Sequence, residues 1–268
     1  SELNDFSYDD YLLVARNPWI SRNSLLWSFF SRDFFHFSGE GTYRPAGTLY
    51  YFLMVKCFGA NPQILHAGSI AIHALASALV VVLARRLGLR AGALWVGCAF
   101  AVHPILTESV CAIGFVRDEL IALFAILFML VITRKEAIRL TDLFAAGVTA
   151  AVACLFKESG VVVIALAASW FIVMRPPERS RREIALILSV TGVVVIAYLV
   201  VRFVLLPALP FPVHPTGANI FQTLLAASVI FAEYVGRMVF SVTLSMDRVP
   251  TPFANLPLWV LVSATVLH

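Results

Sequence analysis

Four short polar strings stand out in a chain that is otherwise rich in apolar residues. Carboxylates can accept a proton from a hydroxyl group or bind a divalent cation, and an arginine can hold a phosphate through two hydrogen bonds. The strings therefore predict a site for general-base catalysis, metal binding or phosphate binding. They are Tyr8-Asp9-Asp10-Tyr11, Tyr43-Arg44-Pro45, His103-Pro104 with Glu108, and Lys157-Glu158-Ser159-Gly160.

Three of these strings have a structural interpretation that stays open at this point. Asp9 or Asp10 would serve equally well as the N-cap of a following helix. Arg44 would suit contact with a lipid headgroup as well as with a bound phosphate. His103 would simply end its helix, because a proline follows it. Residue types alone do not decide between a site and a set of helix ends.

The fourth string favours a functional role. Lys157 and Glu158 are adjacent, and adjacent residues of a helix do not face each other, so we expect each to have its partner elsewhere in the chain. His66 and His73 lie seven residues apart, and hence on one helix face. Because their span is otherwise apolar with small residues nearby, we expect these histidines to form hydrogen bonds between helices.

The composition is that of a membrane protein. Of the 268 residues, 60% are hydrophobic and 13% are charged, whereas soluble domains contain about 25% charged residues. The net charge is +4, but the basic residues cluster between apolar blocks, as in cytoplasmic loops, so we exclude a nucleic-acid partner. The cysteines lack metal-binding spacing and are expected to be small core residues: Cys57, Cys98, Cys111 and Cys154.

The apolar blocks predict an all-α fold, a polytopic bundle of membrane helices. A spanning helix needs roughly 20 apolar residues, and the blocks supply several candidates. We divide the chain into an extracytoplasmic loop, residues 1–47, and a transmembrane domain, residues 48–268. The predicted spans are 60–84, 91–107, 119–133, 141–156, 159–174 and 184–205, followed by 220–242 and a span cut off at 256–268.

Residues 1–47 differ in kind from the rest, because their carboxylates are interleaved with tryptophan and phenylalanine. This mixture predicts an amphipathic first loop whose short helices lie in the membrane interface. The chain begins without methionine and stops within an apolar run. We therefore expect a first membrane helix before Ser1 and a continuation beyond His268.

The basic clusters predict the orientation in the membrane. Cytoplasmic loops are rich in lysine and arginine, and every second junction between apolar blocks is basic. The clusters are Arg85, Arg86 and Arg90; Arg134, Lys135 and Arg139; and Arg175, Arg179, Arg181 and Arg182. The other junctions, with residues 1–47, are therefore predicted to be extracytoplasmic, in a bacterial inner membrane or, in a eukaryote, the endoplasmic reticulum membrane.

Two consecutive spans are too short to cross the membrane fully. The stretch from Arg139 to Arg175 would hold two helices of ~22 Å each, against a hydrocarbon core of ~30 Å. A single long helix is the alternative, but it would place Lys157 and Glu158 in mid-membrane. We therefore expect a hairpin whose charged turn lies below the outer surface, where charge faces a water-filled cavity or a partner.

The order of the motifs resembles that of a known family, and the resemblance covers most of residues 8–250. It is similar to the membrane part of the transmembrane O-mannosyltransferases with tetratricopeptide repeats and their bacterial relatives, within the GT-C superfamily of glycosyltransferases. The motifs that carry it are Asp9-Asp10, Asn17-Pro18, Tyr43-Arg44-Pro45, His66 with His73, Ala101-Val102-His103-Pro104 with Glu108, Lys157-Glu158-Ser159-Gly160 and Leu244-Ser245-Met246-Asp247.

The resemblance implies a bundle of GT-C type that transfers a mannose-like sugar, with inversion, from a polyprenyl-phosphate carrier to a protein or glycan acceptor. It implies Asp9 as the general base and Asp10 as the residue that orients the acceptor. Arg44, Lys157 and Arg117 would bind the phosphate of the lipid-linked donor. The pocket would be lined by Tyr43, His103, Glu108, Asp118 and Glu158.

The chain also departs from the family. No tetratricopeptide repeat occurs in it, and the turn that begins at Gly114 lacks the expected arginine directly after the glycine. No residue is assigned as a metal ligand, and a divalent metal stays an alternative. A second hypothesis is a non-catalytic subunit of a larger membrane complex, with lipids as partners. A transporter is disfavoured, because the two halves lack matching broken helices.

Overall fold

A computed structural model describes residues 42–174, 176–177 and 179–205, with single positions before and after them. The chain divides into a larger unit, Ser1–Val102 with Ser109–Leu209, and a smaller unit, His103–Glu108 with Pro210–His268. Most of the predicted loop 1–47, most of span 220–242 and all of span 256–268 lie outside the described residues. The single positions are Asp10, Leu13, Val14, Asn17, Ile20, Phe29, Phe30, Ser228, Phe231, Val235, Gly236 and Met238.

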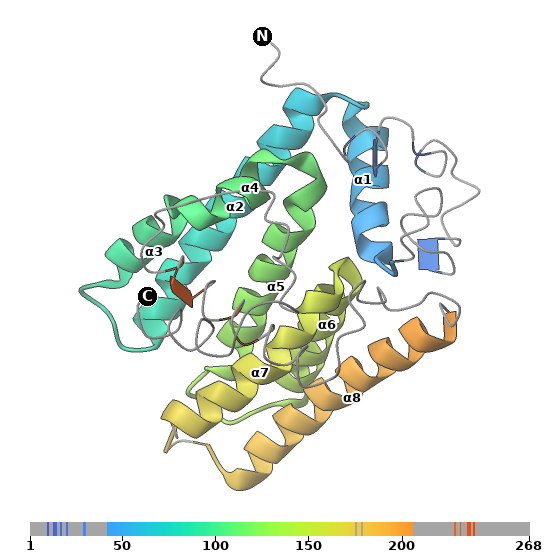
Figure 1. Ribbon diagram of the computed structural model, residues 1–268. Helices are drawn as coiled ribbons and strands as arrows, with labels where there is room; N and C mark the ends of the chain where they lie inside the picture. The colour runs from blue at the N-terminus through green and yellow to red at the C-terminus, as the bar shows by residue number, and fades with distance from the viewer. Residues whose placement is uncertain are drawn as a thin grey trace, which may run out of the picture. The chain divides into compact units, whose positions relative to one another are not determined.

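The described part of the chain is helical and contains no strand (Figure 1), so the predicted all-α class is confirmed. Short turns connect several of the helices: η4 Pro104–Leu106, η5 Ile113–Phe115, η6 Glu158–Val161 and the π-type turn η7 Trp170–Met174. The α-helices are α1 Pro45–Phe58, α2 Pro62–Arg86, α3 Ala93–Ala101, α4 Thr107–Cys111, α5 Val116–Ile132, α6 Leu140–Phe156, α7 Val162–Ser169 and α8 Arg181–Leu205.

Local sequence explains where the first two helices begin and end. Each starts with a proline, whose fixed φ and missing N–H suit the first turn. Asn61 caps α2, because its side chain accepts a hydrogen bond of 2.9 Å from the backbone N–H of Gln63. Gly59 ends α1 with φ of 76°, a conformation that glycine adopts at little cost. Thus α1 is a separate helix that begins before the predicted domain boundary at 47/48.

Two of the described helices are long and apolar enough to cross a membrane, α2 and Arg181–Val204 of α8. A third candidate exists if Ala93–Ala101 and Pro104–Cys111 together form one broken span. Helix α6 and the segment Glu158–Met174 are apolar but shorter. With the apolar composition, these helices identify an all-α membrane protein.

Helix α5 forms the centre of the larger unit. One side packs against α2 and the other against α6, which in turn contacts α8 (Figure 1). Its buried residues join two apolar clusters: Val116, Leu120 and Leu123 belong to one, and Ala125 and Phe128 to the other. The antiparallel course of α5 and α6 brings the start of α5 beside the end of α6.

The hairpin predicted between Arg139 and Arg175 is confirmed, and the single long helix is excluded. Helix α6 ends at Phe156 because Lys157 is extended, with φ of −165° and ψ of 155°. The chain then turns back through η6, where Gly160 lies directly on the backbone of Ala153 and Cys154. A side chain at Gly160 would clash with these backbone atoms, so the turn depends on glycine.

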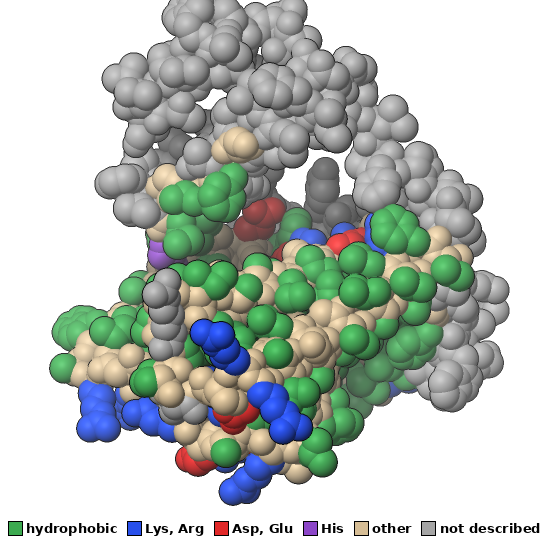
Figure 2. All heavy atoms as spheres, turned by 90° about the horizontal axis from the view of Figure 1, so that it is seen from below, with side chains coloured by type: hydrophobic (Ala, Val, Ile, Leu, Met, Phe, Trp, Pro, Cys, Tyr) green, Lys and Arg blue, Asp and Glu red, His purple; other side chains and the backbone are tan. Residues whose placement is uncertain are grey.

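Large apolar side chains cover the outside of the larger unit. Figure 2 shows hydrophobic side chains over much of one face, with most of the lysine and arginine side chains in its lower part. On α8 alone, Val193, Ile196 and Val204 are each more than 60% exposed. Such a surface suits lipid rather than water.

One prediction about the core is wrong. Of the four cysteines only Cys154 is buried, whereas Cys57, Cys98 and Cys111 are exposed. In a membrane helix an apolar residue can face either the protein interior or lipid, so small size and an apolar context do not by themselves place a cysteine in the core.

Candidate functional site

Five charged side chains from four helices meet at one end of the larger unit. Lys157 Nζ lies 2.8 Å from Asp118 Oδ1, and Arg44 Nε lies 3.1 Å from Glu158 Oε2. Arg202 Nη1 lies 3.2 Å from the other carboxylate oxygen of Glu158. We call these residues the ion-pair cluster. It confirms that Lys157 and Glu158 have their partners elsewhere in the chain and not in each other.

Helix termini position every member of the ion-pair cluster. Arg44 is the N-cap of α1, and Asp118 lies in the first turn of α5. Lys157 and Glu158 occupy the break after α6, while Arg202 lies in the last turn of α8. Three cations face two carboxylates, and each side chain is 14% to 29% exposed. Among the described residues the cluster thus has one cation more than it has carboxylates, and a ligand could reach it.

The charge of Glu158 is stabilised by its surroundings. Partial burial by itself raises the pKa of this carboxyl group, but Arg44, a backbone hydrogen bond and Arg202 more than offset that effect and place the pKa below its ordinary value. The carboxylate therefore stays ionised at neutral pH and holds the two arginines in place.

Arg117 lies under this cluster and joins α1 to α5. Its side chain is buried, and Nε donates a hydrogen bond of 3.1 Å to the carbonyl oxygen of Gly114. The methylene groups pack against Gly47 of α1, where an added Cβ would lie 2.8 Å from Arg117 Cδ. Arg117, although predicted to bind donor phosphate, also has this structural contact.

Asp10 anchors the turn that leads into α5. It is 2% exposed, and Oδ1 accepts a hydrogen bond of 2.7 Å from the backbone N–H of Gly114. Asp9, the predicted general base, lies outside the described residues. Because Asp10 and Arg117 both bind Gly114, the first predicted string and the start of α5 belong to one connected region.

Tyr43 lies next to Arg44 and is buried against α8. The hydroxyl group of Tyr198 donates a hydrogen bond of 3.4 Å to the backbone oxygen of Tyr43, and the two ring centres are 6.3 Å apart. Burial raises the pKa of the Tyr43 hydroxyl group. Tyr43 therefore keeps its proton at neutral pH and can donate a hydrogen bond.

The remaining two predicted pocket residues, His103 and Glu108, belong to the smaller unit. Nδ1 of His103 accepts a hydrogen bond of 3.3 Å from the backbone N–H of Ile105, and Nε2 lies 2.9 Å from the backbone oxygen of Met238. His103 thus caps the turn η4, a structural role that the sequence did not predict.

His73 and Glu119 form a buried pair that the sequence pattern does not predict. Nδ1 of His73 lies 2.9 Å from Glu119 Oε2, and Nε2 lies 3.1 Å from the backbone oxygen of Ala101. Because a carbonyl oxygen can only accept, Nε2 donates to it, and Nδ1 faces the carboxyl group of Glu119. The predicted interhelical bonding of His73 is confirmed, while His66 makes no hydrogen bond among the described residues.

Arg202 is the other site residue that the sequence analysis missed. A lone arginine near the end of an apolar span carries the ordinary signal of a membrane boundary, and only the packing of α8 on α6 reveals its partner. Within the described residues no group of three or more His, Cys, Asp or Glu side chains could hold a metal ion.

The comparisons with known proteins support the resemblance. Protein O-mannosyl-transferase TMTC2 of Homo sapiens is 29% identical over 208 residues, which cover 70% of this chain and 25% of that protein. Protein O-mannosyl-transferase tmtc2 of Xenopus laevis is 31% identical over 176 residues, covering 61% and 21%. Protein O-mannosyl-transferase TMTC1 of Homo sapiens is 30% identical over 142 residues, covering 49% and 16%.

The chain thus spans a quarter or less of the length of these curated relatives. No family model matches it, and no solved structure is similar to it. The predicted resemblance to the transmembrane O-mannosyltransferases is confirmed at the level of sequence.

Proposed function

We propose that this chain forms part of a membrane glycosyltransferase of GT-C type, built like the protein O-mannosyl-transferases that it resembles. Its donor is a mannose-like sugar on a polyprenyl phosphate, and its acceptor is a hydroxyl group of a protein or glycan. The transfer takes place on the extracytoplasmic side of a bacterial inner membrane or of the endoplasmic reticulum membrane. The observation that carries the proposal is the ion-pair cluster, where three cations and two carboxylates from the ends of four helices meet among the residues that the structure describes.

The position of the cluster suits a phosphate carried by lipid. It lies at the start of α1, and α1 rises ~21 Å over its 14 residues before α2 begins (Figure 1). In the proposed topology α2 runs from the outer surface toward the basic clusters. The cluster then lies in a recess below that surface, at a depth where the headgroup phosphate of a membrane-embedded carrier can meet it.

In the proposed reaction the carboxylate of Asp9 takes the proton of the acceptor hydroxyl group. The hydroxyl oxygen forms a bond to the anomeric carbon on one face of the sugar. The bond from that carbon to the phosphate oxygen breaks on the other face, so the configuration inverts. The phosphate leaves with the bonding electron pair, and Arg44, Lys157 and Arg117 stabilise its charge.

The remaining residues have supporting roles in this proposal. Asp10 orients the acceptor, while its hydrogen bond with the backbone N–H of Gly114 stabilises the turn before α5. Tyr43 is a hydrogen-bond donor beside the phosphate, and Asp118 and Glu158 keep the cations in place until the donor arrives.

The test compares Asp9→Asn and Asp10→Asn in membranes that contain the full-length protein. Transfer of labelled mannose from polyprenyl-phosphate mannose to the acceptor fraction is measured. We expect Asp9→Asn to lower the rate by about 100-fold or more, the usual range for loss of a general base. Asp10→Asn keeps an oxygen that can accept the Gly114 N–H, so it should fold and lose activity only partially.

Glu136→Gln is the matched control, because this exposed carboxylate lies in the segment after α5, at the end of that helix opposite the ion-pair cluster. It should transfer mannose at the wild-type rate. Transfer by Asp9→Asn at the wild-type rate would remove the catalytic assignment of that residue.

A second candidate function is a non-catalytic subunit of a larger membrane complex. It is favoured by the fact that the carboxylates already have partners within the chain. Asp118 and Glu158 are paired with cations, and Asp10 accepts a hydrogen bond from the backbone N–H of Gly114. In that case the wild-type protein and all the variants above would show no transfer, while the removal of an ion-pair partner would still lower stability.

A further inference from the structure

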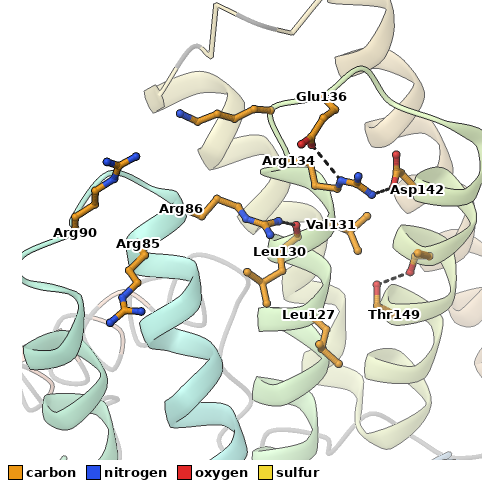
Figure 3. A pocket seen from close by; sticks show the side chains of 12 residues that line it. Arg85, Arg86, Arg90, Leu127, Leu130, Val131, Arg134, Glu136, Asp142 and Thr149 are labelled. Atoms are coloured by element: carbon orange, nitrogen blue, oxygen red, sulfur yellow. Dashed lines mark hydrogen bonds and ion pairs between the residues drawn. The ribbon is translucent and has the colours of Figure 1, made fainter.

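A second charged site lies at the other end of α5 and α6, away from the proposed reaction. A cavity of about 790 Å³ opens between the last turn of α2, the end of α5 and the first half of α6. Figure 3 shows arginine side chains from α2 and from the segment after α5 around this opening. We call it the basic pocket, and it belongs entirely to the larger unit.

Cations dominate the rim of the basic pocket. Five lysine and arginine side chains line it, against two carboxylates. Both carboxylates are already neutralised, because Arg134 pairs with Asp142 at 2.7 Å and with Glu136 at 3.4 Å. Asp142 also accepts the backbone N–H of Arg139, at 3.0 Å. Both carboxylates of the pocket pair with Arg134, so they leave the other four cations of the rim without a counter-charge in the pocket.

Four of the five cations have no anionic partner among the described residues: Arg85, Arg86, Arg90 and Lys135. Of these, Arg86 donates a hydrogen bond to the backbone oxygen of Leu130 and so extends across the opening. All four are exposed. Several unpaired cations around a concave surface attract a multiply charged anion.

The wall of the pocket is apolar where it faces the interior of the bundle. Leu127, Leu130, Val131 and Ala145 line it there. The candidate membrane span α2 ends at Arg86, so the charged rim lies at the level where phospholipid headgroups meet the hydrocarbon. A ligand that binds both the cationic rim and the apolar wall carries a phosphate and an acyl chain.

We infer that the basic pocket binds an anionic phospholipid, with its phosphate between Arg85, Arg90 and Lys135 and an acyl chain along Leu127 and Val131. Basic pockets between membrane helices suit such headgroups, and each lysine or arginine near the surface contributes about 1 kcal/mol of attraction to anionic lipid. In the proposed topology this pocket faces the cytoplasmic leaflet, where it would hold a structural lipid. The inference does not depend on the proposed catalysis.

The test measures lipid binding by native mass spectrometry of the purified full-length protein, with phosphatidylglycerol and phosphatidylcholine as probes. We expect retention of phosphatidylglycerol over phosphatidylcholine. The double variant R85Q/R90Q should lower the apparent affinity for phosphatidylglycerol roughly thirty-fold. The matched control R181Q/R182Q removes two exposed arginines outside the pocket and should lower it by less than about threefold.

Two outcomes would overturn the inference. Equal losses in both double variants would mean that general surface charge, and not the pocket, attracts the lipid. Displacement of phosphatidylglycerol by inorganic phosphate, with phosphate itself retained, would identify a site for free phosphate and exclude the lipid. Neither measurement uses transferase activity, so failure of this inference is distinct from failure of the proposed function.

Discussion

At the scale of single residues, the site depends on how each buried or half-buried charge is paired. Glu158 bridges Arg44 and Arg202, and Asp118 neutralises Lys157. His73 Nδ1 lies 2.9 Å from Glu119 Oε2 in a buried contact. Truncation of one partner leaves the other desolvated and unsatisfied, and this loss outweighs the modest net value of the pair itself.

Glu158→Gln should make the melting temperature depend less on pH in the acid range. The pKa of Glu158 is lowered in the folded protein, so its stabilising effect is complete above the unfolded pKa, about 4.3, and is lost as the pH falls from there through the folded pKa. Melting of wild type and variant in detergent should differ at neutral pH and converge in acid. A difference that persists unchanged through this range would contradict the assignment.

Two substitutions of Glu119 should distinguish the contribution of its hydrogen bond with His73 to stability from the contribution of packing. Glu119→Leu leaves Nδ1 of His73 without a partner and should cost about 2–4 kcal/mol in free energy of unfolding. Glu119→Gln can donate its amide hydrogen to Nδ1 and should cost about 1 kcal/mol.

His66→Ala on the same helix is the control, because His66 makes no hydrogen bond among the described residues, and it should cost less than Glu119→Leu. Denaturant unfolding in micelles measures all three variants. Equal costs for Glu119→Leu and Glu119→Gln would mean that the hydrogen bond to His73 contributes nothing.

At the scale of elements, the decisive feature is the break between α6 and α7. The break places Lys157 and Glu158 beside α5, α1 and α8, and without it neither residue could reach its partners. It depends on the contact of Gly160 with the α6 backbone. Since backbone atoms cannot move aside as a flexible side chain can, this glycine is the most sensitive position of the turn.

Gly160→Ala should therefore disrupt the hairpin, with a loss of about 3 kcal/mol or more in stability, or a loss of folded yield. Gly192→Ala is the matched control. Its added Cβ would lie 3.7 Å from Ile164 Cδ1, an ordinary contact, and alanine stabilises a helix relative to glycine by up to about 1 kcal/mol. Size-exclusion profiles and melting temperatures in detergent report the outcome; equal behaviour of the two variants would contradict the proposed role of Gly160.

At the scale of the whole molecule, the described helices separate two charged sites. The ion-pair cluster and the basic pocket lie at opposite ends of α5, ~25 Å apart along a helix of 17 residues. This separation agrees with a sugar transfer site on one side of a membrane and a lipid-binding rim on the other, which is the topology that the basic loops predict.

Single cysteines introduced just before α2 and just after α5 should test this topology. After replacement of the native cysteines by serine, a membrane-impermeant maleimide should label Ala60→Cys in intact cells or sealed vesicles of known orientation. Glu136→Cys should react only after permeabilisation. The opposite pattern would invert the predicted orientation and remove the extracytoplasmic site.

Sequence alone determined the features that depend on local spacing and composition. Long apolar blocks require helices in lipid, because an unsatisfied backbone is too costly there. The adjacency of Lys157 and Glu158 excluded a self-neutralising pair, and an apolar span with small neighbours indicated that His73 would bond to another helix. The motif order identified the resemblance to O-mannosyltransferases, which the comparisons confirm.

Tertiary structure alone decided which residues meet. No sequence pattern predicts that Arg202 shares Glu158 with Arg44, that Glu119 faces His73, or that α1 forms a separate helix over Arg117. These contacts join residues that are 44 to 114 positions apart, and the packing of α2, α5, α6 and α8 sets them. Local propensity carries no information about such pairings, because the side chains become neighbours only when the apolar faces of the helices are already in contact.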